Sequence, residues 1–361
     1  MNYRYATVLA EKTLGAAGTE TIDIDVKDPI SRLDIGWRPT LADTAMAAAL
    51  AAGISKIELV DGSDVLHSLN GRENQALCIY DRRVPTMNHA ELINGADAYA
   101  TMGIDFGRYL WDRELAFDPS KFRNPQLKIT HDRTAIGAST STHKLEVFAH
   151  CFDERAISPI GFLMAKEHYS YTPTANDAYE TIDLPTDHPI RQLILRNYVA
   201  GQDPHDVADY FRLDEDNQKR TPIDVELEAY IRRMKGVWQE VSEGFVSYCG
   251  TAEDYYKYVT PCDHMTQMFG AGDDVASYAN VHDYIKGGYV QIYGVASAMM
   301  FIGHVAGYLP HHCIQFPFGI QSDLDDWYDV TRLGSLRARV QSAASYSGAV
   351  ISIILQQLRR Y

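Results

Sequence analysis

Four aspartates in the acidic segment "SDLDDWYD" have the residue types and the spacing of an ion site. They are Asp323, Asp325, Asp326 and Asp329. Alternate carboxylates in a loop supply the oxygen ligands that calcium prefers, although this segment lacks the glycine and the final glutamate of an EF-hand loop. A solvated acidic loop is the competing interpretation. Calcium is the only ion that the sequence suggests, and we expect no other cofactor.

Trp327 lies among these aspartates and opens a carbohydrate interpretation. An aromatic platform beside carboxylates would suit a glycosidase or a lectin, and removal of Trp327 or Asp325 would then abolish glycan binding. A tryptophan that packs in the core or in an interface is the simpler interpretation.

Two segments carry the residue types of a transition-metal site. They are "PCDH", with Cys262, Asp263 and His264, and "PHHC", with His311, His312 and Cys313. A cupin centre needs a His-x-His pair, a glutamate and a further histidine around one ion, and no His-x-His occurs in this sequence. Adjacent histidines on a strand point to opposite faces, so His311 and His312 need a kink to share an ion. We expect surface or turn histidines instead.

Motifs of covalent or phosphate chemistry are missing from the sequence. It has no G-x-S-x-G elbow, no G-x-x-x-x-G-K-[ST] loop and no G-x-G-x-x-G after a strand. We therefore expect a protein that is not an enzyme. The alternative is a duplicated β-sandwich that is carbohydrate-active or a bicupin-like metal enzyme.

Recurrent carboxylates reveal an internal repeat. The segment "ETIDIDVKDPISRLDIGWR" at 20–38 returns without a gap as "ETIDLPTDHPIRQLILRNY" at 180–198. Apolar and polar residues alternate on both sides of a proline-containing turn, which predicts strand, turn and strand in each copy. Duplication explains the carboxylate pairs better than catalysis does. The four residues concerned are Glu20, Asp23, Glu180 and Asp183.

The repeat extends in the same order along both halves of the chain. A strand that runs into an acidic turn follows at 54–64 and at 210–218, and each half closes with two further strands, at 127–150 and 336–355. Alternating strands with short turns close into sandwiches or jelly rolls. We predict an all-β fold of two tandem antiparallel jelly-roll domains, the first at 1–157 and the second at 158–361.

A few helices are expected as insertions in this plan. Thr221 is a candidate N-cap and Pro222 suits the first helical position, so a helix is predicted at about 221–243. Further helices are predicted at 63–80 and at about 273–286. The apolar run at 295–309 is short for a membrane span and indicates a buried strand.

Charge and cysteine content exclude several classes of function. The chain has 361 residues and a net charge of −15, and no Lys/Arg cluster offsets this charge. Sequence-specific nucleic-acid binding is therefore disfavoured. Five cysteines without a C-x-x-C pair do not form a disulfide framework and favour a reducing cytoplasm, and the first residues lack the apolar core of a secretory signal.

Several segments together resemble one known family. They are "VDGSDVLHSLNG" before a helix, "QFPFG" before "WYDV…LGSLRARV", and the C-terminal "VISIILQQLRRY". In order and spacing the chain resembles the double jelly-roll major capsid proteins of tailless icosahedral viruses related to adenovirus and to the membrane-containing bacteriophages. The likeness covers most of the chain, although none of its segments is a diagnostic motif.

The resemblance implies a structural subunit of a virion shell. Three copies would form a capsomer with a pseudo-hexagonal outline, and capsomers would tile the capsid lattice with other capsid proteins such as a pentameric vertex protein. The protein would be made in the host cytoplasm, and a phage relative would enclose a lipid membrane. Arg4, Arg359 and Arg360 near the chain ends suit an interfacial contact. Segments 80–110 and 220–285 are candidates for outward towers or for contacts between capsomers.

Overall fold

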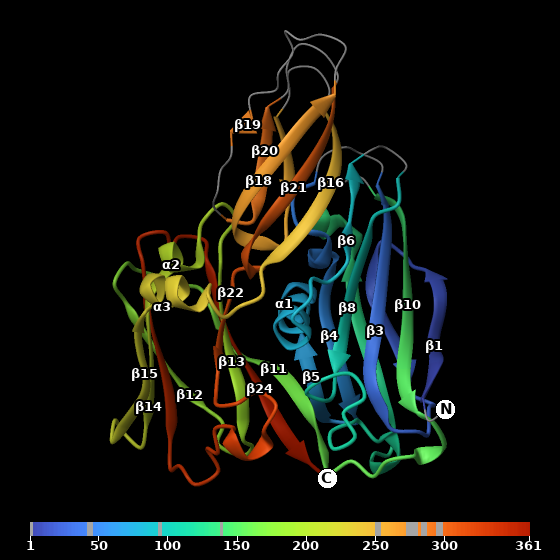
Figure 1. Ribbon diagram of the computed structural model, residues 1–361, viewed down its shortest axis with the longest axis vertical. Helices are drawn as coiled ribbons and strands as arrows, with labels where there is room; N and C mark the ends of the chain where they lie inside the picture. The colour runs from blue at the N-terminus through green and yellow to red at the C-terminus, as the bar shows by residue number, and fades with distance from the viewer. Residues whose placement is uncertain are drawn as a thin grey trace.

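The computed structural model describes residues 3–41, 46–92, 96–137, 140–249, 254–271, 281–282, 287–293 and 299–361. Two β-sandwiches stand side by side, and a narrower group of strands rises above them (Figure 1). Both chain ends lie away from that upper group (Figure 1). The predicted all-β fold of two tandem jelly rolls is confirmed.

The first sandwich packs a five-stranded sheet, in the order β1-β10-β3-β8-β6, against the strands β2-β9-β4-β5. Their bounds are β1 (Tyr3–Thr13), β2 (Ala17–Asp23), β3 (Ile30–Leu41), β4 (Ile54–Asp61), β5 (Asp64–Leu69), β6 (Asn88–His89), β8 (Tyr99–Asp105), β9 (Pro125–Asp132) and β10 (Thr140–Phe152). Buried and half-buried positions alternate along β9, because successive side chains of a strand point to opposite faces. Leu127 and Ile129 therefore enter the core.

The second sandwich repeats this plan strand by strand. The strands β11-β24-β13-β22 face the sheet β12-β23-β14-β15. Their bounds are β11 (Gly161–Tyr171), β12 (Tyr179–Leu184), β13 (Ile190–Tyr198), β14 (Ala208–Glu215), β15 (Arg220–Glu226), β22 (Cys313–Pro317), β23 (Leu336–Ser342) and β24 (Val350–Arg360). In this correspondence β11 takes the place of β1 and β15 takes the place of β5, so the duplication read from the sequence is present in the fold.

The two sandwiches join at a seam. There β5 and β11 pair in parallel through Ser68 and Lys166, which merges the inner strands into one eight-stranded sheet. Helix α1 (Gly71–Arg82) lies along this seam between the sandwiches (Figure 1). Asn70 caps it, since its side chain accepts from the Glu73 N–H while the Glu73 carboxylate accepts from the Asn70 N–H.

The upper group of strands, called the tower below, is mainly an insertion between α3 (Leu227–Met234) and β22. It contains the strands β18-β21-β16 with β7 from the first half, and the small sheet β17-β20-β19. Their bounds are β7 (Glu91–Leu92), β16 (Val241–Cys249), β17 (Asp254–Tyr258), β18 (Pro261–Ala271), β19 (Val281–His282), β20 (Tyr289–Tyr293) and β21 (Met299–Pro310). The strand predicted in 295–309 is confirmed from Met299, but its faces alternate between exposed and buried positions.

The predicted helix at 221–243 is largely wrong. Arg220–Glu226 forms β15, helix α3 covers only Leu227–Met234, and β16 begins at Val241. Ile223 and Val225 alternate with polar neighbours and pair with Leu213 and Phe211 of β14, and this ladder outweighs the helix-start signal of Pro222. Strand β15 and α3 thus belong to the second sandwich, so only the later part of 220–285 forms tower.

Two other predicted helices have different outcomes. Within 63–80 the chain first forms β5, and the helix begins after Asn70. The predicted helix at 273–286 falls mostly on 272–280 and 283–286, outside the described residues, and Val281–His282 within it is strand β19. The remaining helices are α2 (Pro204–Val207) and the 3-10 turns η1 (Leu50–Gly53), η2 (Pro119–Lys121), η3 (Arg133–Ile136), η4 (Asp153–Arg155) and η5 (Leu324–Asp326).

Each sandwich has its own hydrophobic core. The first core includes the fully buried Trp37, Phe117 and Phe162, and the second is centred on Phe211 and Phe316. The first core draws residues up to Met164, while the division at 157/158 stays a prediction. In the described part of the chain, no helix has the length and apolar character needed to cross a membrane.

Candidate functional site

The most extensive buried polar network crosses the seam. Asp81, at the end of α1, accepts hydrogen bonds from Arg191 Nη1 at 2.5 Å, Gln192 Nε2 at 2.8 Å and Gln356 Nε2 at 2.6 Å. Burial raises the pKa of the Asp81 carboxyl, and the Arg191 charge opposes that shift. A buried carboxylate with three donors from the other half locks the two sandwiches together.

A second contact at the seam joins Glu73 of α1 to Arg196 of β13. Arg196 Nη1 lies 3.7 Å from Glu73 Oε1, and both side chains are buried. Burial raises the pKa of Glu73 to about 8, against the opposing charge of Arg196. Tyr80 adds a neutral link, since its hydroxyl donates to the Cys313 carbonyl oxygen at 2.6 Å.

A chain of hydrogen bonds connects α1 to the base of the tower. Gln75 Nε2 donates to Asn88 Oδ1 at 2.8 Å, and Asn88 Nδ2 donates to Thr260 Oγ1 at 2.7 Å. The Thr260 backbone N–H and hydroxyl both engage the Glu243 carboxylate. The tower, which comes from the second half of the chain, is therefore anchored on the first half as well.

A cavity of about 520 Å³ opens along the seam. Its lining includes Tyr80, Asp81, Arg108, Arg191, Trp238 and Ile320. Arg108 is held by Asp112 and Glu114 of its own loop, and Arg191 by Asp81, so these two charges on its wall are already paired. The cavity is a gap between two packed sandwiches, and it brings together no nucleophile with a general base.

Three of the four aspartates of the predicted calcium site act as local turn acceptors, and the fourth, Asp325, donates its backbone N–H to one of them. Asp323 accepts from the Asp325 N–H at 3.1 Å, Asp326 from the Ile320 N–H at 2.5 Å, and Asp329 from the Thr331 N–H at 3.1 Å. In the described residues, three or more possible ligand groups converge within 4.8 Å only at Asp203, His205 and Asp206. The four aspartates therefore do not surround one point, and calcium binding stays a prediction.

Trp327 is 4% exposed and packs with Leu115, Leu163 and Leu358 under the seam. Its ring also lies 5.7 Å from the Arg191 guanidinium. A buried ring is not available as a platform for a sugar, so the carbohydrate interpretation loses the residue that suggested it.

The "PCDH" residues point in separate directions from β18. The Cys262 thiol is buried 3.7 Å from Asp203 Oδ1, and burial raises the pKa of Cys262 well above its usual range. Asp263 forms an ion pair with Lys235, while the His264 ring meets the Thr266 hydroxyl at 3.2 Å. Alternation along the strand turns Asp263 away from Cys262 and His264, and in the described residues these three groups do not converge within 4.8 Å.

His311 and His312 form the tight turn between β21 and β22, with φ of 51° and 67°. The expectation of turn residues is correct, but the expectation of surface residues is wrong because both side chains are 4% exposed. The His311 ring meets Gln75 Oε1 at 2.8 Å, and burial lowers the pKa of His312 to about 3. Both rings thus serve the packing of the seam.

The group of Asp203, His205 and Asp206 was not found by sequence reasoning. It lies at α2, where "DPHD" places three side chains that can bind a metal, two aspartates and one histidine, within four residues. His205 Nε2 is 3.8 Å from Asp206 Oδ1, which is an ordinary ion-pair geometry. The short spacing was the available signal.

The recurrent carboxylates are held by separate local partners. Glu20 pairs with Lys12, Asp23 accepts from Gln126, Asp183 pairs with Arg337, and Glu180 accepts from the Tyr169 hydroxyl. Each contact lies on the outer side of a strand, as the duplication predicted.

The chain ends are packed into the sandwiches. Arg4 pairs with Asp28 at 2.6 Å, and Arg359 pairs with Asp64 at 2.5 Å. The Tyr361 hydroxyl donates to the Ala116 carbonyl oxygen at 2.7 Å, while Arg360 is exposed.

The arrangement of strands defines a class of protein, the double jelly roll. No protein-family model matches the chain, and no curated protein shows significant sequence similarity to it. Solved structures do match over nearly its whole length. The major capsid protein of Sulfolobus turreted icosahedral virus (STIV) aligns with a TM-score of 0.59 and 10% identity, covering 98% of this chain and 96% of that protein.

Two further structures give the same result. The major capsid protein P2 from bacteriophage PM2 aligns with a TM-score of 0.56 and 9% identity, over 99% of this chain and 98% of that one. The PBCV-1 virus capsid chain aligns with a TM-score of 0.55 and 11% identity, over 99% of this chain and 94% of that one. The chain therefore has the fold of these capsid proteins.

Proposed function

We propose that this chain is the major capsid protein of an icosahedral virus, a structural subunit and not an enzyme. The observation that carries the proposal is the extent of the likeness. Three capsid proteins align over 94% to 98% of their own length and over at least 98% of this chain. At this coverage the likeness takes in both sandwiches and the tower.

The duplicated architecture suits a shell. Two sandwiches with the same strand order stand side by side, so three copies present six similar units around a ring. A six-unit outline tiles a surface of hexagons, whereas one enzyme active site has no need of it. The functional surfaces are then the faces by which copies meet.

The proposed partners follow from this role. The chain associates with itself as a trimer and then in the capsid lattice, beside other capsid proteins such as a pentameric vertex protein. It is made in the host cytoplasm and resides in the virion. Arg4, Arg359 and Arg360 lie near the chain ends, away from the tower, and this end is proposed to face the interior, where an enclosed membrane would meet it.

The enzyme alternative has little support. Trp327 is buried, the "PCDH" and "PHHC" residues do not converge, and the raised pKa of Glu73 and the lowered pKa of His312 belong to buried side chains at the seam. A bicupin or a carbohydrate-active sandwich would need an open site on one of these groups. The capsid role requires no cofactor.

Calcium remains a proposed ligand for the acidic loop of Asp323, Asp325, Asp326 and Asp329. Thermal melting with and without calcium chloride tests it. A rise in Tm that Asp325→Asn abolishes would establish the site, and an unchanged Tm would mark a solvated loop.

Native mass spectrometry of the purified chain tests the proposed function. We expect a dominant species at three times 40.5 kDa, and electron microscopy of concentrated samples should then show hexagonal arrays or shells. A stable monomer that retains iron, manganese or zinc would overturn the proposal in favour of a duplicated β-sandwich enzyme.

A further inference from the structure

The internal duplication leaves two equivalent strand edges unused. At the seam β5 pairs with β11, but their counterparts β15 and β1 are the edge strands of their sheets. Figure 1 shows β15 and β1 at opposite lateral sides of the molecule. One copy therefore carries both halves of a second seam and cannot close it on itself.

The ladders align β1 with β11 residue by residue. Pairing can be followed strand by strand from each of these strands to a residue of the sequence repeat. Two such series of paired residues are equivalent because they end on Leu33 and Leu193, which recur in the repeat. The first series pairs Ala6 with Ala149 and Ala149 with Leu33, and the second pairs Lys166 with Leu355 and Leu355 with Leu193. Ala6 thus occupies the position of Lys166, the residue through which β11 meets β5.

The same reasoning aligns β15 with β5. The paired residues now end on Thr21 and Thr181, which also recur in the repeat. From strand to strand, the two series of paired residues are Ser68–Glu58–Lys128–Thr21 and Asp224–Arg212–Arg339–Thr181. Asp224 thus occupies the position of Ser68, so a second seam would pair Ala6 with Asp224.

Side chains that are buried at the seam are exposed on the unused edges. Ala165 of β11 is 2% exposed, and Tyr5, at the equivalent place in β1, is 70% exposed. At the end of α1 the buried Asp81 contacts the other sandwich, whereas Val237, which follows α3, is 67% exposed. Apolar surface of this kind at both edges is typical of a contact face.

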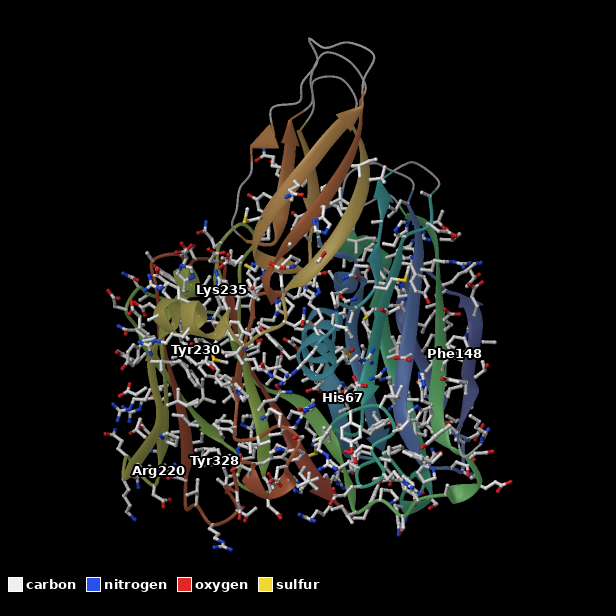
Figure 2. All side chains as sticks on the ribbon, in the orientation of Figure 1. His67, Phe148, Arg220, Tyr230, Lys235 and Tyr328 are labelled. Atoms are coloured by element: carbon white, nitrogen blue, oxygen red, sulfur yellow. The ribbon has the colours of Figure 1, made fainter. Side chains whose placement is uncertain are left out.

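A charge pair repeats with its signs exchanged. The seam carries an ion pair between Asp64 of β5 and Arg359 of β24. The ladders place Arg220 where Asp64 lies and Phe152 where Leu358 lies, so Asp153, the next residue along the chain, corresponds in sequence to Arg359. Arg220 is 68% exposed and Asp153 is 36% exposed, and among the described residues of one copy their ion-pair partners are Glu215 and Arg4 respectively. Figure 2 shows Arg220 on the side opposite Phe148 of β10.

We propose that β15 and α3 of one copy dock on β1 of the next copy, in parallel register, and reproduce between chains the seam that joins the halves of one chain. Ala6 pairs with Asp224, and Arg220 meets Asp153 across the contact. The contact is head-to-tail, and it closes a ring of three when each copy is rotated by a third of a turn from the last. This inference rests on the proposed function, since it names the surfaces by which the capsid subunit meets its own kind.

Cysteine cross-linking tests the register. Neighbouring strands lie about 4.8 Å apart, within the span of a disulfide, so the double variant Ala6→Cys with Asp224→Cys should oxidise to covalent oligomers that stop at the trimer. The four described native cysteines are buried and free. The matched control, Ala6→Cys with Lys56→Cys, uses a half-exposed position on β4 away from both edges. It should yield no covalent oligomers.

Charge exchange tests the pair. Arg220→Glu and Asp153→Arg should each weaken trimer association about tenfold, because each places like charges together. The combined variant should recover most of the loss, which a misfolded protein could not do. Lys56→Glu, an exposed reversal away from the edges, should leave association unchanged.

The outcomes separate this inference from the proposed function. Trimers that form without an Ala6–Asp224 cross-link and ignore the charge reversals would overturn the docking and leave the capsid role standing. A chain that stays monomeric at high concentration and forms no cross-link would overturn both. Covalent oligomers that stop at the trimer, together with recovery of trimer association in the combined charge variant, support the docking as stated.

Discussion

Asp81 and Arg191 form a 2.5 Å ion pair in which each residue comes from a different jelly roll. Their side chains are 4% and 5% exposed, so the pair is shielded from water and salt. Gln192 and Gln356 donate to the same carboxylate, which satisfies its remaining acceptor sites. This buried carboxylate at the end of α1 is therefore one of the contacts that hold the two sandwiches together, beside the β5–β11 pairing and the Tyr80 hydrogen bond.

Replacement of Asp81 by alanine should destabilise the protein strongly. Arg191 would keep its charge in a buried site without its partner, and such a loss costs about 3–5 kcal/mol. Chemical denaturation of the variant and of the wild type, at matched concentration and oligomeric state, measures this change in the free energy of unfolding.

Asp329→Ala provides the control for this measurement. Asp329 is half-exposed and pairs with Arg332 at 3.9 Å, so its loss should change the free energy of unfolding by less than about 0.5 kcal/mol. Equal effects of the two substitutions would show that the seam does not depend on the buried pair.

Stability should fall as the pH is lowered from 6.5. His67 lies buried on β5, its ring 3.1 Å from Asn74 Nδ2 of α1, and burial lowers its pKa from 6.5 to about 3. Between pH 6.5 and pH 3 the His67 ring binds a proton in the unfolded chain but stays neutral in the folded chain. The slope from this group reaches about 1.4 kcal/mol per pH unit, and it ends below pH 3.

His67→Gln should flatten that acid slope, because an amide does not titrate. His143 and His312 also have a pKa lowered by burial, to about 4 and about 3, so part of the slope should remain. His168→Gln, on an exposed part of β11, is the control. Urea midpoints measured from pH 7 to pH 4 decide the matter, and an unaltered slope in His67→Gln would contradict the assignment.

The sequence predicts the repeated strands because their burial follows a simple period. Ile22 and Ile24 in the first copy, and Ile182 and Leu184 in the second, are all buried. A strand with one face in solvent has apolar and polar residues in alternation along its sequence. The same alternation at the same spacing in both halves indicated the duplication. The fold class could therefore be derived without a structure.

Other features depend on contacts that no local pattern reports. Pro222 and its neighbours carry a helix-start signal, yet β14 offers Ile223 a strand partner. His311 looks like a turn residue, but its burial is decided by Gln75, far away in the sequence. The seam network of Asp81 likewise joins segments that only the tertiary structure brings together.

Gly53 should not tolerate a methyl group. A Cβ at this position would lie 2.0 Å from Cη2 of Trp37, whose ring is fully buried in the first core. The ring cannot retreat in a packed interior, so Gly53→Ala should cost about 1–3 kcal/mol. Gly15→Ala, where nothing lies within 4 Å of the added atom, should be close to neutral in the same denaturation experiment.

Trp327→Ala distinguishes the core role from the carbohydrate role. The ring packs against Leu115, Leu163 and Leu358, so its removal should cost about 3–5 kcal/mol of stability. Asp325→Ala changes an exposed residue of the same turn and should cost less than about 0.5 kcal/mol. A glycan array probed with the wild type should show no binding. Binding that both variants lose at unchanged stability would instead make Trp327 a sugar platform and revive the carbohydrate-active alternative.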